Sequence, residues 1–578
     1  MPCTELTFKS VDGVPLFYRA WNASRPGTRA AILFHRGHEH SGRMEETAAA
    51  LAAAGMAVFA WDQRGHGKSP GDRGWAEDLG VFVKDAEAFA RHLEREHGVR
   101  MQETLILGYS VGAVLAASWI HDYAPPVRGL VLAAPAFRVK LYVPFALTAL
   151  RLRRRMGGKF FVKSYVKSRW VTHDPDQQDL YDADPLIFRQ IAGNILLDLR
   201  DASERLIRDA GAIVAPTLVL SAAQDYVVSV ADQKRFFDGL SSPLKEWHLL
   251  SGFHHAVLHE RERAMAIGMI VDFAKRCFDR PAGDGASLLQ AHRAGFTQRE
   301  HDELSTPLSI FSPKRWMFAA ARAWMRTVGR LSDGIALGWR RGFDSGVSLD
   351  HVYRDRASGS LGLGRLIDRV YLNSIGWRGI RRRKQNMESL LASAIAETRA
   401  AGRPVRILDV ACGGGRYVLD ALRRDGANGT TAVLRDWSDA SVRRATDLAR
   451  ELGVPGVTVE KSDAFDRASL ESVSPAPTIA IVSGLYELFG DNDRVLESLK
   501  GIAAAMKDGG VLLYTNQPWH PQLEMIARVL VNRDGAPWIM RRRTQAEMDQ
   551  LAAAAGFVKR SMEVDPWGIF TVSLAAKA

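Results

Sequence analysis

The chain has 578 residues, which is long for one domain and, at about 150 residues per domain, predicts two or three folding units. A content of 47% hydrophobic and 25% charged residues is ordinary for a globular protein, and three widely spaced cysteines exclude a disulfide framework. The net charge of +12 indicates an anionic partner, which could be a membrane surface, nucleic acid or an acidic substrate. Neither a signal peptide nor an apolar run of about 18 residues is recognisable, so we expect a cytoplasmic protein.

Short apolar runs alternate with helical patterns through the first half of the chain. The runs are residues 31–34, 57–61, 104–107, 130–132 and 217–220. Such alternation predicts βαβ units and a parallel sheet, and therefore an α/β fold. Residues 137–207 interrupt the pattern with a helical, basic segment, which we expect to form a lid over the carboxyl edge of the sheet.

A predicted strand at 105–107 runs into a G-x-S-x-G motif at 108–112, and a helical pattern follows. A serine on such a strand-to-helix turn projects its hydroxyl away from the backbone, which predicts that Ser110 is a nucleophile. Asp225 and His255 follow later strands, in the chain order Ser, acid, His that this arrangement uses. We expect His255 to accept the serine proton and Asp225 to orient the imidazole.

This chemistry needs two backbone N–H groups as an oxyanion hole. We expect one from Val111, directly after the nucleophile, and the other from Gly37, in the loop after the first predicted strand of the parallel series. Three histidines of that loop, His35, His38 and His40, are close enough in sequence to suggest a metal site. No carboxylate cluster accompanies them, so we predict no metal.

Residues 5–280 resemble the monoacylglycerol lipase and lysophospholipase branch of the α/β-hydrolases. The resemblance rests on the Ser110 motif and on residues 35–43, 62–69, 172–175 and 181–186. It implies an esterase or lipase that hydrolyses carboxylic esters with a long acyl or alkyl group through an acyl-enzyme. It also implies His255 rather than its neighbour His254 as the catalytic histidine, because the Ala-Val-Leu-His-Glu that follows matches the register of the family. The family usually has glycines where Arg36 and His38 stand here.

A turn-rich stretch at 281–285 marks the expected end of this first domain. Residues 286–344 are helical in pattern without a strand signal, and a second βαβ series begins near residue 405. We therefore expect an α/β-hydrolase domain at 1–281, a helical linker at 282–344 and a second domain at 345–578.

Two stretches combine arginines with large apolar residues, one at 141–155 in the expected lid and one at 314–341 in the expected linker. Basic amphipathic segments with tryptophan are typical of interfacial membrane contact, which raises the hypothesis of peripheral binding to an anionic membrane. The alternative is that the first stretch lines the acyl pocket and the second packs between the domains.

The second domain opens with a strand that ends in Asp409, followed by a glycine-rich turn at 411–415 and a helical pattern. Glycines let the backbone approach a nucleoside-bearing ligand closely. The dinucleotide site of a nicotinamide-dependent reductase is disfavoured, because Val418 stands in place of the third glycine of G-x-G-x-x-G and Asp409 would repel a pyrophosphate. Asp436 ends the next predicted strand, where it could bind both hydroxyls of a ribose.

Residues 345–578 resemble the class I S-adenosylmethionine (SAM) dependent methyltransferases, on the evidence of residues 409–415, 436–438, 462–465 and 507–512. The resemblance implies a Rossmann-like sheet of seven mostly parallel strands and SAM as the cofactor. The SAM-binding residues it implies are Asp409, Ala411, Gly413, Gly415, Asp436, Trp437, Asp463 and Ala464. Residues 483–485 would line the methionine end of SAM, and we expect residues 349–381 to cover the site as a helical lid.

The methyl acceptor is not identified by the sequence. Motifs typical of DNA methylation are absent, so we expect a small-molecule or lipid-like acceptor and no nucleic acid partner. The candidates for the acceptor pocket are Tyr486, Glu487, Asn516, Trp519 and His520.

Together these motifs predict a bifunctional enzyme, a serine ester hydrolase fused to a SAM-dependent methyltransferase. The alternative is that one domain is catalytically silent and acts as a binding or regulatory module.

Overall fold

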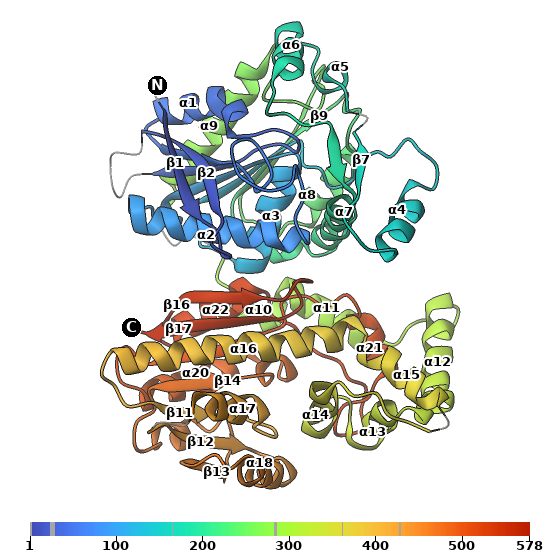
Figure 1. The fold of residues 1–578 in the computed structure, drawn as a ribbon, viewed down its shortest axis with the longest axis vertical. Coiled ribbons are helices and arrows are strands. Elements are labelled where there is room, and N and C mark those ends of the chain that lie inside the picture. Colours follow the sequence, from blue (N-terminus) through green and yellow to red (C-terminus); the bar gives the residue numbers. More distant parts are fainter. Residues whose placement is uncertain (1–2, 23–28, 165, 282–285, 361, 427–428) are drawn as a thin grey trace. The chain divides into compact units, whose positions relative to one another are not determined.

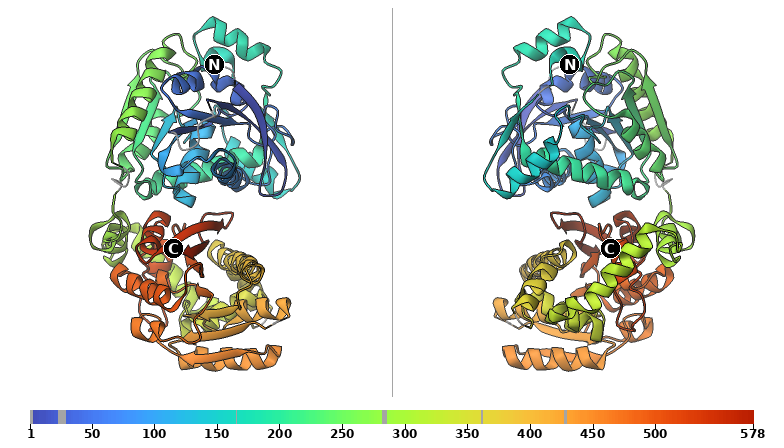
Figure 2. Two further views of the ribbon diagram at one scale, coloured as in Figure 1. Left: turned by 90° about the vertical axis from the view of Figure 1, so that its left-hand side faces the viewer. Right: turned by 90° about the vertical axis from the view of Figure 1, so that its right-hand side faces the viewer.

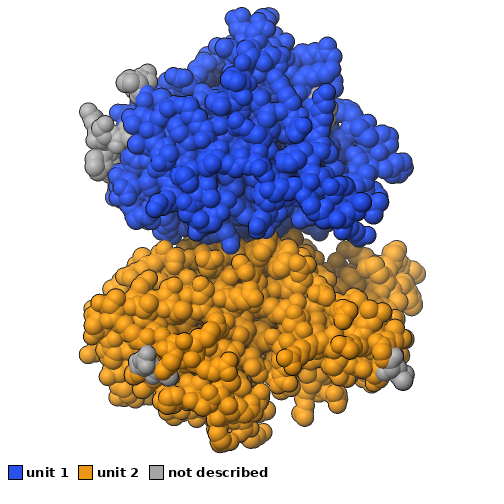
Figure 3. Space-filling view, viewed as in Figure 1, with its two compact units in different colours: residues 1–286 blue, residues 287–578 orange. Residues whose placement is uncertain are grey.

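The computed structural model describes residues 3–22, 29–164, 166–281, 286–360, 362–426 and 429–578. The chain divides into two compact units, residues 1–286 and 287–578, which Figure 3 shows in different colours. Residues 282–285, where the domain boundary was expected, lie outside the described residues. Among the described residues, none of the helices has the length and apolar character needed to span a membrane.

The first unit is built around an eight-stranded sheet in the order β1-β2-β4-β3-β5-β6-β9-β10 (Figure 1). Its strands from β3 onward in this order are parallel, while β2 pairs antiparallel with both β1 and β4. The strand bounds are β1 (Cys3–Lys9), β2 (Pro15–Trp21), β3 (Ala30–Phe34), β4 (Ala57–Trp61), β5 (Thr104–Tyr109), β6 (Gly129–Ala133), β9 (Thr217–Ala222) and β10 (Lys245–Leu250). Every residue of β3, β4, β5, β6 and β9 is buried, as in parallel sheets covered on both faces.

Helices cover both faces of this sheet. The helices are α1 (Glu45–Ala53), α2 (Leu79–His97), α3 (Val111–Tyr123), α8 (Val230–Gly239) and α9 (Arg263–Asp279). Helices α1 and α9 pack on one face, where Leu51 and Phe273 join Leu33 and Leu107 of the strands in one hydrophobic core. Helix α3 packs against β3, β5 and β6. The sheet therefore positions whatever follows the carboxyl end of each strand along one edge.

The segment expected as a lid lies between β6 and β9. It contains α4 (Ala146–Arg155), α5 (Ser168–Val171), α6 (Pro175–Ala183) and α7 (Gly193–Arg208). It also contains a two-stranded antiparallel ribbon, β7 (Phe161–Lys163) with β8 (Gln190–Ala192), where the sequence had predicted helix alone. Strands of three residues are too short to produce a periodic signal in the sequence.

The second unit contains a seven-stranded, mostly parallel sheet, as the resemblance to class I methyltransferases implies, in the order β13-β12-β11-β14-β15-β17-β16. Only β17 runs antiparallel to its neighbours β15 and β16. The strand bounds are β11 (Arg406–Asp409), β12 (Thr431–Asp436), β13 (Val457–Lys461), β14 (Ile479–Val482), β15 (Val511–Asn516), β16 (Phe557–Val564) and β17 (Thr571–Lys577).

Successive strand residues enter different cores because side chains alternate across a sheet. Ile407 faces a core with α16 (Ile375–Ala400), α17 (Arg416–Asp425) and α18 (Asp439–Leu452). Its neighbour Leu408 faces a core with α19 (Arg467–Glu471), α20 (Asn492–Ala505) and α22 (Gln545–Ala554). Figures 1 and 2 show helices on both sides of this sheet, with the long α16 running along one of them.

Residues 287–344, which were expected as a linker, belong to the second compact unit. They form α10 (Ala291–Ala294), α11 (Phe296–Ser305), α12 (Pro313–Arg326) and α13 (Asp333–Arg341), followed by α14 (Gly346–Arg354) and α15 (Leu363–Leu372). Helix α11 contacts α21 (Leu523–Val529), and its Glu300 pairs with the buried Arg542 guanidinium at 2.5 Å. Sequence patterns identify helices but not their tertiary partners, which is why this segment looked like a linker.

Candidate active sites

Ser110 occupies a tight turn between β5 and α3. Its φ of +54° lies in the left-handed region, which a non-glycine residue adopts only where the surroundings enforce it. The flanking glycines make this turn possible. A Cβ at Gly108 would come within 2.5 Å of Ala113 Cα, and a Cβ at Gly112 would clash with the His35 carbonyl oxygen. The G-x-S-x-G pattern thus follows from close packing of the turn against β3.

The structure brings the three expected triad residues together. His255, in the loop after β10, has its Nε2 2.8 Å from Ser110 Oγ and its Nδ1 2.8 Å from Asp225 Oδ2. Asp225, in the loop after β9, also accepts hydrogen bonds from the Val227 and Val228 N–H groups, each at 2.8 Å. All three triad side chains are buried.

These contacts set the charge state of the acid. Burial alone would raise the pKa of Asp225, but the adjacent His255 imidazole and the two backbone N–H groups outweigh burial and lower the pKa below its usual value. The carboxylate therefore stays ionised at neutral pH, and His255 holds the tautomer with a hydrogen on Nδ1 and a lone pair directed at the serine hydroxyl.

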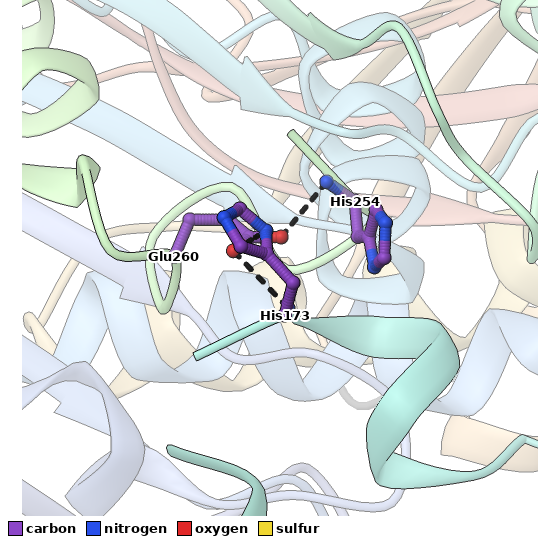
Figure 4. A group of neighbouring side chains, drawn as sticks. All are labelled: His173, His254 and Glu260. Atoms are coloured by element: carbon purple, nitrogen blue, oxygen red, sulfur yellow. Dashed lines mark hydrogen bonds and ion pairs between the residues drawn. The ribbon is translucent and has the colours of Figure 1, made fainter. Parts of the chain in front are cut away.

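The neighbouring His254 has different partners (Figure 4). Its backbone N–H donates to Glu260 Oε1 at 2.8 Å, and the Thr172 hydroxyl donates to Glu260 Oε2 at 3.0 Å. The His254 ring lies 5.4 Å from that of His173 and 5.3 Å from that of Tyr226, measured between ring centroids. Glu260 thus ties the segment that carries His255 to Thr172 in the middle of the lid.

His173, His254 and Glu260 are a group that the sequence did not single out. Each offers one atom of a type that binds metals, and these atoms lie within 4.8 Å of one another. The Glu260 carboxylate is fully buried and already accepts the hydrogen bonds described above. His173 lies far from the other two residues in the sequence, and therefore no motif indicated the group, whereas the three histidines at 35–40 lie close together and suggested a metal site.

The two expected oxyanion donors lie against each other. A Cβ at Gly37 would come within 2.9 Å of Val111 Cγ2, so only a glycine lets this loop approach the start of α3 so closely. Val111 is the first residue of α3, whose N-terminal N–H groups favour a negative charge.

The two departures from the usual glycines have structural partners of their own. His38 adopts φ +71° and donates from Nδ1 to the Phe188 carbonyl at 3.1 Å, and burial lowers its pKa to about 4. The Arg36 guanidinium pairs with Glu39 and lies over the rings of Tyr109 and Tyr181, at 5.5 and 5.6 Å. Both side chains thus have partners within the protein, although Arg36 Nη1 is buried without one among the described residues, and both residues line the cavity beside Ser110.

A cavity of about 100 Å³ opens beside Ser110 and His255 and is also lined by Gly37 and Val111. Most of its remaining wall is apolar and comes from the lid: Phe188, Ile191, Ile195, Leu196 and Leu199. The site therefore combines a serine hydroxyl, an imidazole hydrogen-bonded to it and an apolar compartment.

In the second unit, the glycine-rich turn joins β11 to α17. Gly413 has φ +56°, and a Cβ there would meet no atom within 4 Å, so the turn has free space on that side. Its N–H donates to Asp436 Oδ2 at 2.9 Å, and Ser438 N–H donates to Asp436 Oδ1 at 2.9 Å. Gly415 has φ +68° and precedes α17. Asp436, at the end of β12, is thus fixed beside the turn.

Asp409 is placed differently from the expectation of a direct ligand contact. It is fully buried, accepts a hydrogen bond from the Tyr417 hydroxyl, and its Oδ1 accepts one from Ala411 N–H at 3.3 Å. Burial raises its pKa to about 7. The Asp409 carboxyl therefore supports the glycine-rich turn from the protein interior.

The remaining implied SAM contacts flank the same sheet edge. Asp463, after β13, accepts from Phe465 N–H at 2.9 Å, and the adjacent Ala464 is buried. Trp437 is 70% exposed, and the Lys461 ammonium lies 5.8 Å from its ring centroid. An open glycine turn, two acids and an exposed aromatic at the ends of adjacent strands fit a ligand with an amino-acid part, a ribose and an adenine.

Helix α14, part of the expected lid, lies against this turn. A Cβ at Gly346 would come within 3.8 Å of Gly413 Cα, and the Arg416 guanidinium donates to Asp350 at 2.6 Å. The expected lid also includes α15 and the first part of α16.

A larger cavity of about 460 Å³ lies in the second unit. Of the five acceptor-pocket candidates, Glu487 and His520 line it. Tyr486 is instead buried and donates to Ser498 Oγ at 2.9 Å, and the Asn516 amide donates to the Arg543 carbonyl at 3.1 Å, so both have structural partners. Trp519 is not among the lining residues. Sequence reasoning missed Arg383 and Gln517, which line the cavity without belonging to any motif.

Two family models match the chain. One, described as "Serine aminopeptidase, S33", matches residues 27–262, and the other, described as "Putative methyltransferase", matches residues 270–577. The second match covers more than half of the chain.

The chain is 47% identical over 584 residues to the uncharacterized protein YnbC of Escherichia coli (strain K12), covering 99% of this chain and 98% of that protein. It is 26% identical over 266 residues to a monoacylglycerol lipase of Mycolicibacterium smegmatis, covering 46% of this chain and 94% of that protein. It is 28% identical over 261 residues to a human monoglyceride lipase, covering 43% of this chain and 82% of that protein. The chain therefore belongs to the methyltransferase family of the second model and to the same family as YnbC, with an α/β-hydrolase domain fused in front of the methyltransferase-family domain.

Proposed function

We propose that the first unit is a serine hydrolase that cleaves carboxylic esters with an apolar acyl or alkyl group. The observation that carries this proposal is the continuous hydrogen-bonded chain from Ser110 through His255 to Asp225, at 2.8 Å for both links. A serine hydroxyl is a weak nucleophile unless an oriented base takes its proton, and this chain supplies such a base.

The reaction follows from the positions of these groups. Ser110 Oγ attacks the carbonyl carbon of the ester while its proton passes to His255 Nε2. The N–H groups of Gly37 and Val111 stabilise the resulting oxyanion, each worth about 3–4 kcal/mol in the transition state. The alcohol leaves with the proton from His255, and a water molecule then releases the acid by the same two steps.

The wall of the cavity supports an ester over a peptide substrate. The described residues that line it include no Asp or Glu, whereas an aminopeptidase needs an anionic group to hold the α-amino group of its substrate. The apolar lid residues instead suit a hydrocarbon chain.

For the second unit, we propose SAM-dependent methyl transfer to a small-molecule or lipid-like acceptor. The turn at 411–415 and Asp436, Trp437, Asp463 and Ala464 are the groups that would hold SAM, and Asp409 would keep the turn in shape. Bound SAM supplies a methyl group on a positively charged sulfur. Support comes from the open side of Gly413 and from the fixed position of Asp436 beside it.

We also propose that the protein contacts anionic membrane surfaces. Helix α12 has no buried residue, and its Trp316 and Met317 are exposed beside Lys314 and Arg315. In the lid, Val143 and Phe145 are exposed just before α4, whose last turn carries three arginines, and they do not line the acyl cavity. Exposed aromatics next to cations suit the interface of an anionic bilayer.

A paired experiment on the full chain tests both catalytic assignments and the alternative of a silent domain. An alkyl fluorophosphonate should label Ser110, identified by mass spectrometry of the labelled peptide, and calorimetry should detect SAM binding in the same preparation. A preparation of folded protein in which Ser110 stays unlabelled would make the first unit a silent module. Absence of SAM binding would do the same for the second unit.

A further inference from the structure

The cavity of about 460 Å³ in the second unit lies at the carboxyl ends of β14 and β15. Gly484 and Glu487 follow β14, the latter within a short 3₁₀ turn (Tyr486–Leu488), and Gln517 and His520 follow β15. Ligands of open α/β sheets bind at this edge, in pockets of about 300–1,000 Å³. Both the position and the size are therefore those of a ligand site.

Most of the cavity wall is hydrocarbon or aromatic. The apolar lining residues come from α13, α14, α15, α16, α21, the segment after α21 and the residue before β17: Ile335, Leu349, Ile367, Tyr371, Trp377, Ile380, Met525, Ile526, Leu530, Trp538, Met540 and Phe570. Such a wall favours an elongated apolar body over a sugar, nucleotide or peptide, whose polar groups would find few partners there.

Four buried polar atoms of the cavity-lining residues lack hydrogen-bond partners among the described residues: the acceptors Glu487 Oε2 and Asp344 Oδ1, and the donors Gln517 Nε2 and Trp538 Nε1. Of these residues, Glu487 and Gln517 follow the carboxyl ends of β14 and β15. Buried polar groups are nearly always paired, so an unpaired acceptor and an unpaired donor in one apolar cavity indicate a ligand that supplies both partners.

The other Glu487 oxygen is already held. The Thr515 hydroxyl donates to Oε1 at 3.1 Å, and the buried Arg383 guanidinium donates to it at 3.4 Å. The Gly484 N–H donates to the same Thr515 hydroxyl at 2.8 Å. This network fixes the carboxylate through one oxygen and leaves the other available to a ligand.

The charges in the cavity favour a neutral head group. Glu487 is paired with Arg383, and Asp344 is paired with Arg533 at 3.1 Å, so the wall carries no net charge. An acid head would be repelled by the Glu487 carboxylate, and an ammonium head by Arg383. A hydroxyl is neutral, and it donates one hydrogen bond and accepts others at the same atom.

His520 adds a second donor to this wall. The Gln522 N–H donates to its Nδ1 at 3.0 Å, and burial lowers the His520 pKa to about 4, so the ring is neutral at pH 7. With Nδ1 acting as an acceptor, the ring hydrogen is on Nε2. His520 therefore presents a donor rather than a base.

We propose that this cavity binds the methyl acceptor, and that the acceptor is an elongated apolar molecule with one neutral hydroxyl, held between Glu487 Oε2 and Gln517 Nε2. The inference rests on the proposed methyl transfer and names the substrate class for it. Trp324, Leu366 and Val370 line the cavity and are also exposed, so they give it an apolar mouth through which a hydrocarbon chain can enter.

The test measures binding to the full chain without SAM, through the tryptophan fluorescence of Trp377 and Trp538. Three probes share one chain length: 1-decanol, its methyl ether and decanoate. Decanol should bind at least about tenfold more tightly than either of the others, because the ether lacks the donor and decanoate carries a charge. Equal affinity for all three probes, or a preference for decanoate, would overturn the hydroxyl assignment.

Three variants show which cavity gives rise to the fluorescence change on decanol binding. Ile380→Trp fills the cavity of the second unit and should abolish decanol binding, while Leu196→Trp fills the cavity of the first unit and should leave it unchanged; both wild-type residues are 7% exposed. Glu487→Gln should reduce the preference for decanol over its ether to less than about threefold, with circular dichroism confirming that each variant is folded. Decanol binding that survives Ile380→Trp would overturn the proposal.

A separate titration with SAM distinguishes a failure of this inference from a failure of the proposed methyl transfer. SAM binding without decanol binding would overturn this inference alone. Decanol binding without SAM binding would overturn methyl transfer, and with it the role of the cavity as an acceptor site.

Discussion

The two candidate sites differ in how their buried polar groups are satisfied. In the first unit, the side chains of Ser110, His255 and Asp225 satisfy one another, with both links at 2.8 Å. In the second unit, Glu487 Oε2 and Gln517 Nε2 are buried without partners among the described residues. On the functions proposed above, the first site needs only water beside its ester, whereas the second needs two organic ligands, which would supply the missing hydrogen-bond partners.

The same contrast applies to the acids that the sequence singled out. Asp225 is ionised and directed at a catalytic partner, while Asp409 is fully buried under its turn with a pKa raised to about 7. Both acids follow a buried parallel strand in the sequence. What separates them is the balance between burial and hydrogen bonding: His255 and two backbone N–H groups outweigh burial at Asp225, whereas burial dominates at Asp409, and only the tertiary structure reveals this difference.

The largest expected effect is on Ser110. Ser110→Ala should lower the turnover of p-nitrophenyl butyrate by about 10⁴-fold or more, because the members of a triad act as a unit. The same variant should bind SAM as the wild type does, since the second unit is compact by itself. Turnover within tenfold of the wild type would contradict the assignment of the nucleophile.

The two adjacent histidines, His254 and His255, should contribute very differently to ester turnover. His255→Ala removes the base and should cost about as much activity as Ser110→Ala, whereas His254→Ala should cost less than about tenfold, because its backbone N–H, rather than its ring, bonds to Glu260. Ester turnover of the two variants checks this directly. The reverse order would show that the register after β10 is assigned to the wrong residue.

Asp436 should matter for SAM affinity. Asp436→Ala removes a carboxylate that holds the glycine-rich turn and is placed to bind the ribose, and it should weaken SAM binding by about 2–4 kcal/mol. Asp439→Ala is the matched control, because Asp439 lies three residues later on the surface and pairs with Lys461. If calorimetry finds the two variants equal, Asp436 does not belong to the SAM site.

The contribution of Asp409 to folding stability should depend on pH. Its folded pKa of about 7 lies above the unfolded value of 3.8, so the stability it contributes is fully present below pH 3.8 and is lost as the pH rises through 7. Asp409→Asn, which avoids ionisation, should gain stability relative to the wild type between pH 5 and pH 8, by about 1.4 kcal/mol per pKa unit at most. Denaturant unfolding at both pH values measures this. A gain that is the same at pH 5 and pH 8 would rule out a titrating Asp409.

The smallest expected effect concerns membrane contact. Arg315→Glu on α12 should weaken the binding free energy for anionic vesicles, measured by co-sedimentation, by roughly 1–2 kcal/mol. Arg450→Glu on α18, which is also exposed but lies on a different helix, should not change it. Binding of the wild type should also weaken with salt, since screening acts over about 10 Å at 0.1 M. Wild-type protein that stays in the supernatant at low salt would exclude this contact.

The sequence predicts those features of the structure that follow from local backbone and side-chain requirements. The strand-to-helix turn at Ser110 needs two glycines, and the glycine-rich turn after β11 needs positive φ, so both leave motifs. The alternating patterns likewise predicted the parallel βαβ series of the second unit, while the number of seven strands came from the resemblance to class I methyltransferases. Such features depend on residues close together in the chain.

Other features depend on which elements meet in space, and no local pattern encodes them. Arg383 is in the middle of a long helix, more than 100 residues from Glu487, to which it bonds. Residues 287–344 have the pattern of a helical linker, yet they are part of the second unit. Tyr486 and Asn516 stand beside the cavity residues in sequence, but their hydrogen bonds hold the protein core.

The central claim is that one chain carries a preassembled hydrolase site and a ligand-dependent methyltransferase site that work independently. The most direct test is calorimetric titration of SAM into the full chain before and after complete labelling with an alkyl fluorophosphonate. The account predicts one label per chain on Ser110 without SAM, and one SAM bound per chain with the same affinity in both states. A chain that labels only in the presence of SAM, or that loses SAM binding after labelling, would contradict it.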